Sequence, residues 1–112
     1  MSLHDTLGNP VDVLRQDRSF HITYADDQIA GRTDFRDTDG ERLFFHTEVE
    51  DHYGGRGLAS TLIDAALDAT ATDGLTVVAV CPFVKARLEK AAGAVTWRKP
   101  SPDDLAWLRQ HL

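Results

Sequence analysis

The middle of the chain constrains the fold most, because its hydrophobic pattern changes from strand to helix and back to strand. Residues 41–49 alternate like a strand, residues 56–72 repeat apolar side chains at helical spacing, and residues 75–80 form a short, β-branched apolar run. A crossover of this kind is right-handed and joins parallel strands, so the carboxyl ends of both strands reach one edge of the sheet. Ligands of parallel sheets bind at that edge, and Cys81 directly follows the second strand there.

A glycine-rich turn, Tyr53-Gly54-Gly55-Arg56-Gly57-Leu58-Ala59, joins the first strand to the helix. Glycine allows sharp bends and a close approach to a ligand, and a helix start offers unpaired N–H groups with partial positive charge. Arg56 adds a mobile cation, and Ser60 places a hydroxyl in the first helical turn. The turn predicts an anion site, although a turn without any ligand explains the glycines equally well. It matches neither the dinucleotide fingerprint nor the P-loop.

The segments before this unit predict an antiparallel meander. Residues 1–10 resemble a loose lead-in, and residues 19–24 alternate as a strand. Residues 28–35 form a weaker strand, in which Gly31 marks a bulge or a close approach of another chain segment. Turn-forming residues follow each of these strands, at 26–27 and at 37–40. The predicted class is α+β, with an antiparallel meander leading into a βαβ unit and helices on both faces of a mixed sheet.

The strand at residues 41–49 is apolar at the start of both of its faces. Strict alternation places Leu43, Phe45, Thr47 and Val49 on one face, and Phe44, His46 and Glu48 on the other. This pattern is typical of a central strand that is covered on both sides.

Two further helices and a short strand are predicted after residue 80. Pro82 favours the first turn of a helix that ends by Gly93, and Trp97 belongs to a last short strand. Residues 103–112 form a C-terminal helix whose Trp and Leu side chains dock on the domain. The length of 112 residues fits one domain, which we expect to span residues 1–112.

Three blocks of the sequence together resemble the GNAT (GCN5-related N-acetyltransferase) superfamily. Gly57-x-Ala59 with its preceding residues resembles the acyl-CoA pyrophosphate loop, usually written R/Q-x-x-G-x-G/A. His46-Thr47-Glu48-Val49 and Cys81-Pro82-Phe83-Val84 resemble blocks of a subfamily of very short GNAT-like proteins. The resemblance covers about residues 18–93, so the C-terminal helix lies outside it. It implies a GNAT-like fold and an acetyl-CoA-dependent N-acetyltransferase.

The resemblance also implies how acetyl-CoA binds. The backbone of Thr47 to Val49 would pair with the pantetheine arm, the N–H groups around Gly55 to Ser60 would hold the pyrophosphate, and the second parallel strand would splay from the first to admit the thioester. Gly54 stands where the motif often has Arg or Gln, and we expect the site to remain because backbone N–H groups hold most of the phosphate. The implied cofactor-binding residues are Thr47, Val49, Gly54, Gly55, Arg56, Gly57, Leu58, Ala59 and Ser60.

Three side chains are candidates for the chemistry of acetyl transfer, which needs a base and a leaving thiolate. Cys81 would cap the helix that begins at Pro82, where the helix start favours a thiolate that could accept the acyl group; a small buried residue is the structural alternative. His46 and Glu48 share a strand face and could act as the base, while a hydrogen-bonded core histidine and a solvated carboxylate are the alternatives. Glu50 could also act as the base, with a solvated edge charge as the alternative, and Tyr53, Lys85 and Arg87 are weaker candidates for contacts with substrate or CoA.

The composition excludes several other classes of function. The formal net charge of -6 disfavours nucleic acid and anionic membrane surfaces as partners. The only cysteine cannot form an intrachain disulfide, which fits a cytoplasmic protein, and no apolar run is long enough to span a bilayer. The five histidines are scattered without a helical i, i+4 pair, so we expect no metal site.

Competing functions stay open at this stage. The leading interpretation is N-acetyl transfer from acetyl-CoA to an amine of a small molecule or a protein, by a monomer or weak homodimer. A non-catalytic acyl-CoA-binding or sensing module of the same fold is the alternative, because so short a chain leaves little material for an acceptor pocket. A thiol-based redox protein that uses Cys81 is disfavoured by the lack of a second cysteine.

Overall fold

The described strands form one mixed sheet, in which the strands follow each other in chain order, β1 to β7. The computed structural model describes residues 3–91 and 93–112. The strands are β1 (Leu3–His4), β2 (Pro10–Arg15), β3 (Ser19–Tyr24), β4 (Ile29–Thr38), β5 (Glu41–Val49), β6 (Thr76–Ala79) and β7 (Trp97–Arg98). The helices are α1 (Leu58–Thr72), α2 (Pro82–Ala91) and α3 (Pro102–His111), and a 3-10 turn η1 (Asp51–Tyr53) precedes α1.

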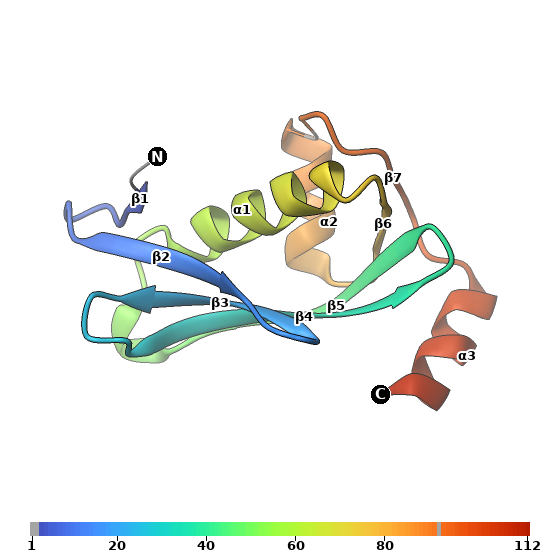
Figure 1. The fold of residues 1–112 in the computed structure, drawn as a ribbon, viewed down its shortest axis with the longest axis horizontal. Helices are drawn as coiled ribbons and strands as arrows, with labels where there is room; N and C mark the ends of the chain where they lie inside the picture. The colour runs from blue at the N-terminus through green and yellow to red at the C-terminus, as the bar shows by residue number, and fades with distance from the viewer. Residues whose placement is uncertain (1–2, 92) are drawn as a thin grey trace.

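Strand directions confirm the predicted α+β class. β1 to β5 pair in antiparallel fashion, whereas β5, β6 and β7 are parallel, as the predicted crossover requires. Figure 1 shows α1 and α2 on one side of the sheet and α3 on the other, so helices lie on both faces. The central position of β5 between β4 and β6 is also confirmed.

The core lies between α1 and the sheet. The apolar stripe predicted for α1 is buried in full, and its members are Leu58, Leu62, Ile63, Ala66 and Leu67. The rings of Phe20, Phe35 and Phe44 from three strands meet beneath it, with centroids 5.2–6.4 Å apart. α2 adds Val84 and Leu88 to the same cluster. A stripe at helical spacing can bury this much apolar surface only on one face, which fixes the orientation of α1.

The prediction of which β5 residues share a face was wrong, because β5 contains a bulge. Asp34 pairs with His46, but the next residue, Phe35, pairs with Phe44, so Phe45 is an extra residue in the ladder. A bulge of this kind reverses the alternation beyond it. Phe44 therefore joins Thr47 and Val49 on the α1 side.

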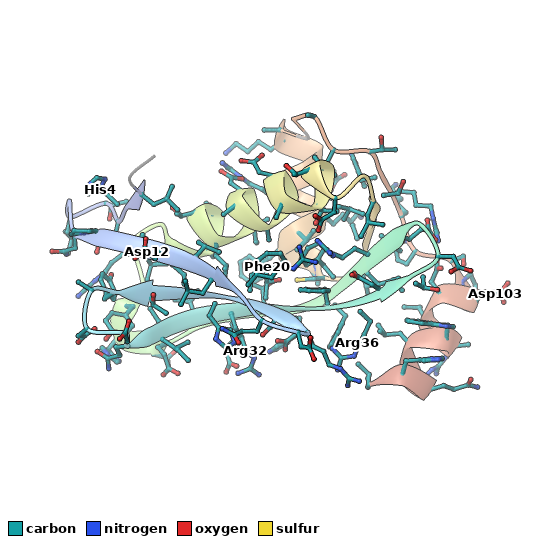
Figure 2. All side chains as sticks on the ribbon, viewed as in Figure 1. His4, Asp12, Phe20, Arg32, Arg36 and Asp103 are labelled. Carbon is teal, nitrogen blue, oxygen red and sulfur yellow. The ribbon has the colours of Figure 1, made fainter. Side chains whose placement is uncertain are left out.

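Leu43, Phe45, His46 and Glu48 instead belong to the opposite face of the sheet, as their β4 partners show. The guanidinium of Arg36 lies over the Phe45 ring at 5.1 Å, and Arg32 pairs with Glu48. Figure 2 shows Arg32 and Arg36 on the face away from α1. The bulge thus reverses the order in which the side chains of β5 alternate between the two faces, without a break in the strand.

The expectation of a loose lead-in at residues 1–10 was also wrong for its described part. Leu3 and His4, which form β1, pair with β2. The turn that joins β1 to β2 is closed by Asp5, which is only 6% exposed. β2 was not predicted, although Val11 and Val13 alternate and pack on the core. Residues 1–2 lie outside the described residues.

Element boundaries otherwise shift by small amounts. α1 begins at Leu58 and not at residue 56, because Gly57 has a left-handed conformation (φ +71°) and serves as the N-cap. β4 extends to Thr38, and the helix predicted from Pro82 ends at Ala91. Gly31 is a close approach, since a Cβ there would lie 2.8 Å from the carbonyl oxygen of Glu48, whereas the bulge lies at the preceding residue, Ala30.

A buried arginine fastens the start of β5 to the end of α1. The side chain of Arg42 is 1% exposed and donates to both carboxylate oxygens of Asp37, at 2.8 and 3.1 Å. It also donates to Thr70 and to Asp73, each at 3.1 Å. A buried charge is tolerated only with such complete pairing, so this network fixes how α1 lies on the sheet.

Candidate functional site

The glycine-rich turn leaves the first N–H groups of α1 without protein partners. Gly57 supplies no capping side chain, and the first intrahelical bond runs from the Thr61 N–H to the Gly57 carbonyl at 3.1 Å. Within residues 3–91 and 93–112, no acceptor meets the N–H groups of Leu58, Ala59 and Ser60. Open N–H groups at a helix start attract anions.

A hollow of about 210 Å³ continues from this helix start toward α2. Ala59 and Ser60 line one side of it, and Phe83 and Lys90 line the other. Phe83 is 59% exposed, which is unusual for a ring of that size unless the site has a use for it. Arg87 also lines the hollow, but its guanidinium is bound to Asp64 by two hydrogen bonds of 2.7 Å.

The second half of β5 has a bare edge on the β6 side. Parallel pairing with β6 ends where Phe44 meets Ala79, and the N–H of Cys81 then donates to the Phe44 carbonyl at 2.8 Å. The N–H of Glu50 points to β4, where it donates to Ala30. By alternation, the backbone groups of Thr47 and Val49 point the other way, to an edge on which no strand of the described chain pairs.

Cys81 lies beside this edge and contacts Thr47. Its Sγ is 3.3 Å from the Thr47 hydroxyl, which is itself 2.9 Å from the hydroxyl of Thr33. As predicted, Cys81 caps α2, because its carbonyl accepts the first intrahelical bond from Lys85 at 3.0 Å. The residue is 2% exposed. A thiol this buried is poorly accessible to reagents, and this argues against a general thiol redox role.

His46 and Glu48 lie together on the opposite face of β5. The Nε2 atom of His46 is 3.7 Å from Glu48 Oε2, and the Arg32 guanidinium is 3.3 Å from the same oxygen. Both side chains are about half exposed, 50% and 56%. The three predicted catalytic side chains therefore form two groups, one on each side of the same strand, and Cys81 is not hydrogen-bonded to His46.

Arg56 is not the mobile cation that the sequence suggested. Its guanidinium donates to the Tyr24 hydroxyl at 3.2 Å, lies 3.9 Å from the buried carboxylate of Asp5, and covers the Tyr53 ring at 5.2 Å. The hydrogen bond that Arg56 donates to Tyr24, despite an opposing effect of burial, raises the pKa of Arg56. Sequence reasoning missed Asp5 and Tyr24, because their role depends on contacts between distant segments.

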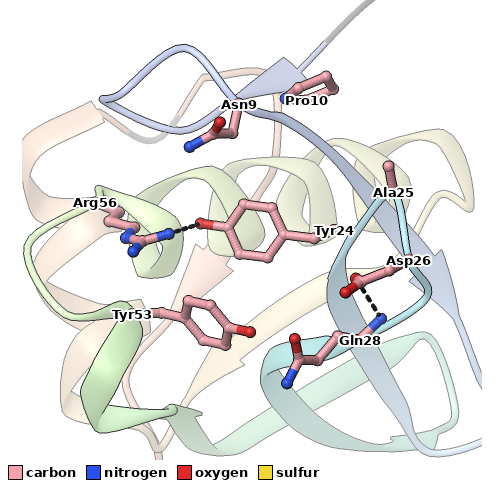
Figure 3. Close-up of a pocket in the computed structure, with 8 residues that line it drawn as sticks. All are labelled: Asn9, Pro10, Tyr24, Ala25, Asp26, Gln28, Tyr53 and Arg56. Atoms are coloured by element: carbon pink, nitrogen blue, oxygen red, sulfur yellow. Dashed lines mark hydrogen bonds between the residues drawn. The ribbon is translucent and has the colours of Figure 1, made fainter.

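Tyr24, Tyr53 and Arg56 line a hollow of about 400 Å³ at the end of the sheet next to the glycine-rich turn. Figure 3 shows Arg56 pointing at the Tyr24 hydroxyl, with the Tyr53 ring on the other side of the opening and Asp26 and Gln28 across from it. The Tyr24 and Tyr53 rings are 5.0 Å apart. The hollow adjoins the turn, but neither Cys81 nor His46 lines it.

A mixed sheet whose parallel strands part beside an uncapped, glycine-rich helix start defines the class of the N-acetyltransferase fold. Residues 19–95, well over half of the chain, match the family model of the GCN5-related N-acetyl-transferases, so the chain belongs to this family.

The fold is similar to the NMR solution structure of a GCN5-like protein from Staphylococcus aureus, described as a proposed N-acetyltransferase. The two chains superpose with a TM-score of 0.61 at 24% identity, over 81% of this chain and 91% of the other. At this identity the likeness concerns the fold. No curated protein shows significant sequence similarity to the chain.

Two further observations concern the described residues as a whole. No helix among them is long and apolar enough to cross a membrane. Nor do residues 3–91 and 93–112 bring three or more His, Cys, Asp or Glu side chains together in a geometry for a metal ion.

Proposed function

We propose that the protein is an acetyl-CoA-dependent N-acetyltransferase. One observation supports this most: the unpaired edge of β5 is followed, through the glycine-rich turn, by the open N–H groups at the start of α1. A ligand with a pyrophosphate and an amide-containing arm matches both, since phosphate suits the helix start and amides suit an unpaired strand edge.

Each part of acetyl-CoA has a counterpart along this path. The N–H groups from Gly55 to Ser60 would hold the pyrophosphate, and the backbone of Thr47 and Val49 would pair with the pantetheine amides. The hollow beside Phe83 and Lys90 would receive the nucleotide, with the ring for stacking and the ammonium for phosphate. Gly54 contributes no side chain, so recognition of the phosphate relies on backbone groups.

The thioester would lie at the unpaired edge of β5, beside Cys81. Transfer requires the acceptor nitrogen to attack the thioester carbon, so that a C–N bond forms, the C–S bond breaks, and CoA leaves as a thiolate. The amine gives up a proton, which His46 or Glu48 could take from the outer face of the sheet. Cys81, on the inner side, could protonate the leaving thiolate or accept the acetyl group first.

The separation of these groups favours one rival, a module that binds acyl-CoA without transferring the acetyl group. Cys81 and His46 lie on opposite sides of β5, and so they do not form a nucleophile–base pair. Binding needs only the helix start and the strand edge, whereas transfer also needs an acceptor amine to reach the thioester from outside.

Release of free thiol from acetyl-CoA, measured over a panel of amines, separates the two functions. We expect amine-dependent release by the wild type, and a fall in kcat of about 100-fold or more for His46→Gln or Cys81→Ala with little change in KM for acetyl-CoA. Lys99→Gln, an exposed substitution just after β7, is the control. Tight binding without release for any amine would favour the binding module, and acetyl on Cys81 by intact mass would support a covalent route.

A further inference from the structure

The N-terminal turn of residues 5–9 lies outside the segment that matches the family and contacts the carbonyl side of the glycine-rich turn. The Thr6 N–H donates to the Arg56 carbonyl at 3.0 Å, and the Thr6 hydroxyl donates to the Gly55 carbonyl at 3.3 Å. A Cβ at Gly57 would lie 3.1 Å from the Thr6 methyl group. Residues distant in sequence thus bond two successive carbonyls of the turn whose N–H groups would face the ligand.

Asp5 is the buried centre of this contact. Its side chain is fully covered and accepts from the N–H groups of Leu7 and Asn9, at 3.0 and 2.8 Å, and from the Asn9 side chain at 3.1 Å. The Tyr24 hydroxyl donates to it at 2.7 Å. Burial opposes its charge, but the bonds from Tyr24 and Asn9 outweigh burial and lower the pKa of Asp5 to about 2. Asp5 is therefore a carboxylate at neutral pH.

A carboxylate at this position fixes the direction of the hydrogen bonds that follow. An ionised carboxylate only accepts, so Tyr24 must donate its proton to Asp5. The Tyr24 oxygen then accepts from the Arg56 guanidinium at 3.2 Å, and the same guanidinium lies over the Tyr24 and Tyr53 rings at 5.8 and 5.2 Å. The order from Asp5 through Tyr24 to Arg56 admits one arrangement of protons.

We propose that Asp5 is a positioning residue for the acetyl-CoA site: through Tyr24 and Arg56 it holds the glycine-rich turn so that the first N–H groups of α1 stay open to the pyrophosphate. This inference rests on the proposed function. It extends that function to a segment of the chain that the family match does not reach.

The isosteric variant Asp5→Asn tests the direction of the bonds. An amide can still accept from Leu7 and Asn9, but its NH₂ group cannot accept from Tyr24 and donates to the Tyr24 oxygen instead. Arg56 then has to share that oxygen with a second donor. We expect the Kd for desulfo-CoA to rise about tenfold, because the turn loses a charge-assisted hydrogen bond that helps to fix it. In the transfer assay, KM for acetyl-CoA should rise and kcat should stay nearly constant.

Tyr24→Phe supplies a second route to the same result. It keeps the ring that packs against Tyr53 and removes only the hydroxyl. If Asp5 acts through Tyr24, the double variant should bind desulfo-CoA about as weakly as either single variant. Additive losses in the double-mutant cycle would overturn the proposed route.

Asp73→Asn is the matched control at the other end of α1. Asp73 also accepts hydrogen bonds from charged partners, Arg15 at 2.7 Å and Arg42 at 3.1 Å. We expect it to lower stability without changing the Kd. An unchanged Kd in a folded Asp5→Asn variant refutes the positioning role alone, as does an equal rise in Asp73→Asn. Failure of the wild type to bind desulfo-CoA refutes the proposed function and the positioning role with it.

Discussion

The starts of α1 and α3 differ in almost every feature that decides whether a helix end is closed. At α3, the Ser101 side chain accepts from the Asp104 N–H, and the Asp104 carboxylate accepts from the Ser101 N–H at 2.7 Å, which makes a complete capping box. Two acidic residues stand in its first turn. At α1 the N-cap is Gly57, no side chain caps the helix, and the first turn has no acidic residue.

This difference indicates that the two helix starts serve different ends. A capping side chain stabilises a helix by about 1 kcal/mol relative to its absence, and the chain makes full use of it at α3. There Asp104 also accepts two bonds from Arg98, which binds Glu41 at the start of β5. α3 is thereby fastened to the sheet, whereas the positive end of α1 stays without a side-chain cap.

Gly57→Asp should produce the largest effect, because it puts a carboxylate at the open helix start. Repulsion of phosphate and contact with Thr6 should weaken desulfo-CoA binding by about 100-fold or more, equivalent to about 2.7 kcal/mol. Isothermal titration calorimetry measures the change.

Gly74→Asp is the control for this substitution. Gly74 has almost the same φ, +73°, has open space around it, and lies just beyond the other end of α1. The Gly74→Asp variant should carry the same added charge and backbone strain as Gly57→Asp, but its affinity for desulfo-CoA should not change. Equal losses in both variants would mean that the helix start has no special role in binding.

Opening α3 should affect stability only, and by a smaller amount. Asp104→Asn removes the charge that accepts two bonds from Arg98, at 2.7 and 2.9 Å. We expect the free energy of unfolding in urea to fall by about 1–2 kcal/mol at neutral pH, given the partial exposure of the pair. Desulfo-CoA binding should not change, and a weakened affinity would show that α3 belongs to the site.

The pH dependence of the unfolding free energy of Asp104→Asn gives the smallest and most specific effect. Hydrogen bonds from Arg98 outweigh burial and hold the pKa of Asp104 far below its usual range. Its contribution is therefore full above the unfolded pKa of about 4 and is lost as pH falls toward the folded value. The difference in unfolding free energy between wild type and Asp104→Asn should shrink as pH falls below about 4. A constant difference would mean that the charge of Asp104 is not the cause.

The fold was predictable where the pattern is local. The period of α1 and the apolar run of β6 lie within single elements, and their topology follows from the handedness of crossovers. The bulge at Phe45 was not predictable, because the side chains alternate smoothly through it and only the pairing with β4 reveals the extra residue. Consequently the sequence placed Phe44 on the same face as His46, whereas the two residues lie on opposite faces.

The site was predictable only where backbone groups dominate. Glycines before an apolar helix indicate an open helix start, whatever surrounds them. The surroundings of Arg56 depend on Asp5 and Tyr24, which reach it from separate strands and turns, and no short pattern records such contacts. The same holds for Arg42, whose partners come from β4 and from both the interior and the end of α1.

An NMR titration of the ¹⁵N-labelled wild-type protein with desulfo-CoA tests the central claim most directly. It reports on each backbone amide, and the ligand lacks the reactive sulfur, so chemistry does not interfere. We predict saturable shifts concentrated at the amides of Gly55 to Ser60 and of Thr47 and Val49, with little change in the capped start of α3. No saturable shift at millimolar ligand, or shifts centred on α3, would contradict the assignment of the open end of α1 as the acetyl-CoA site.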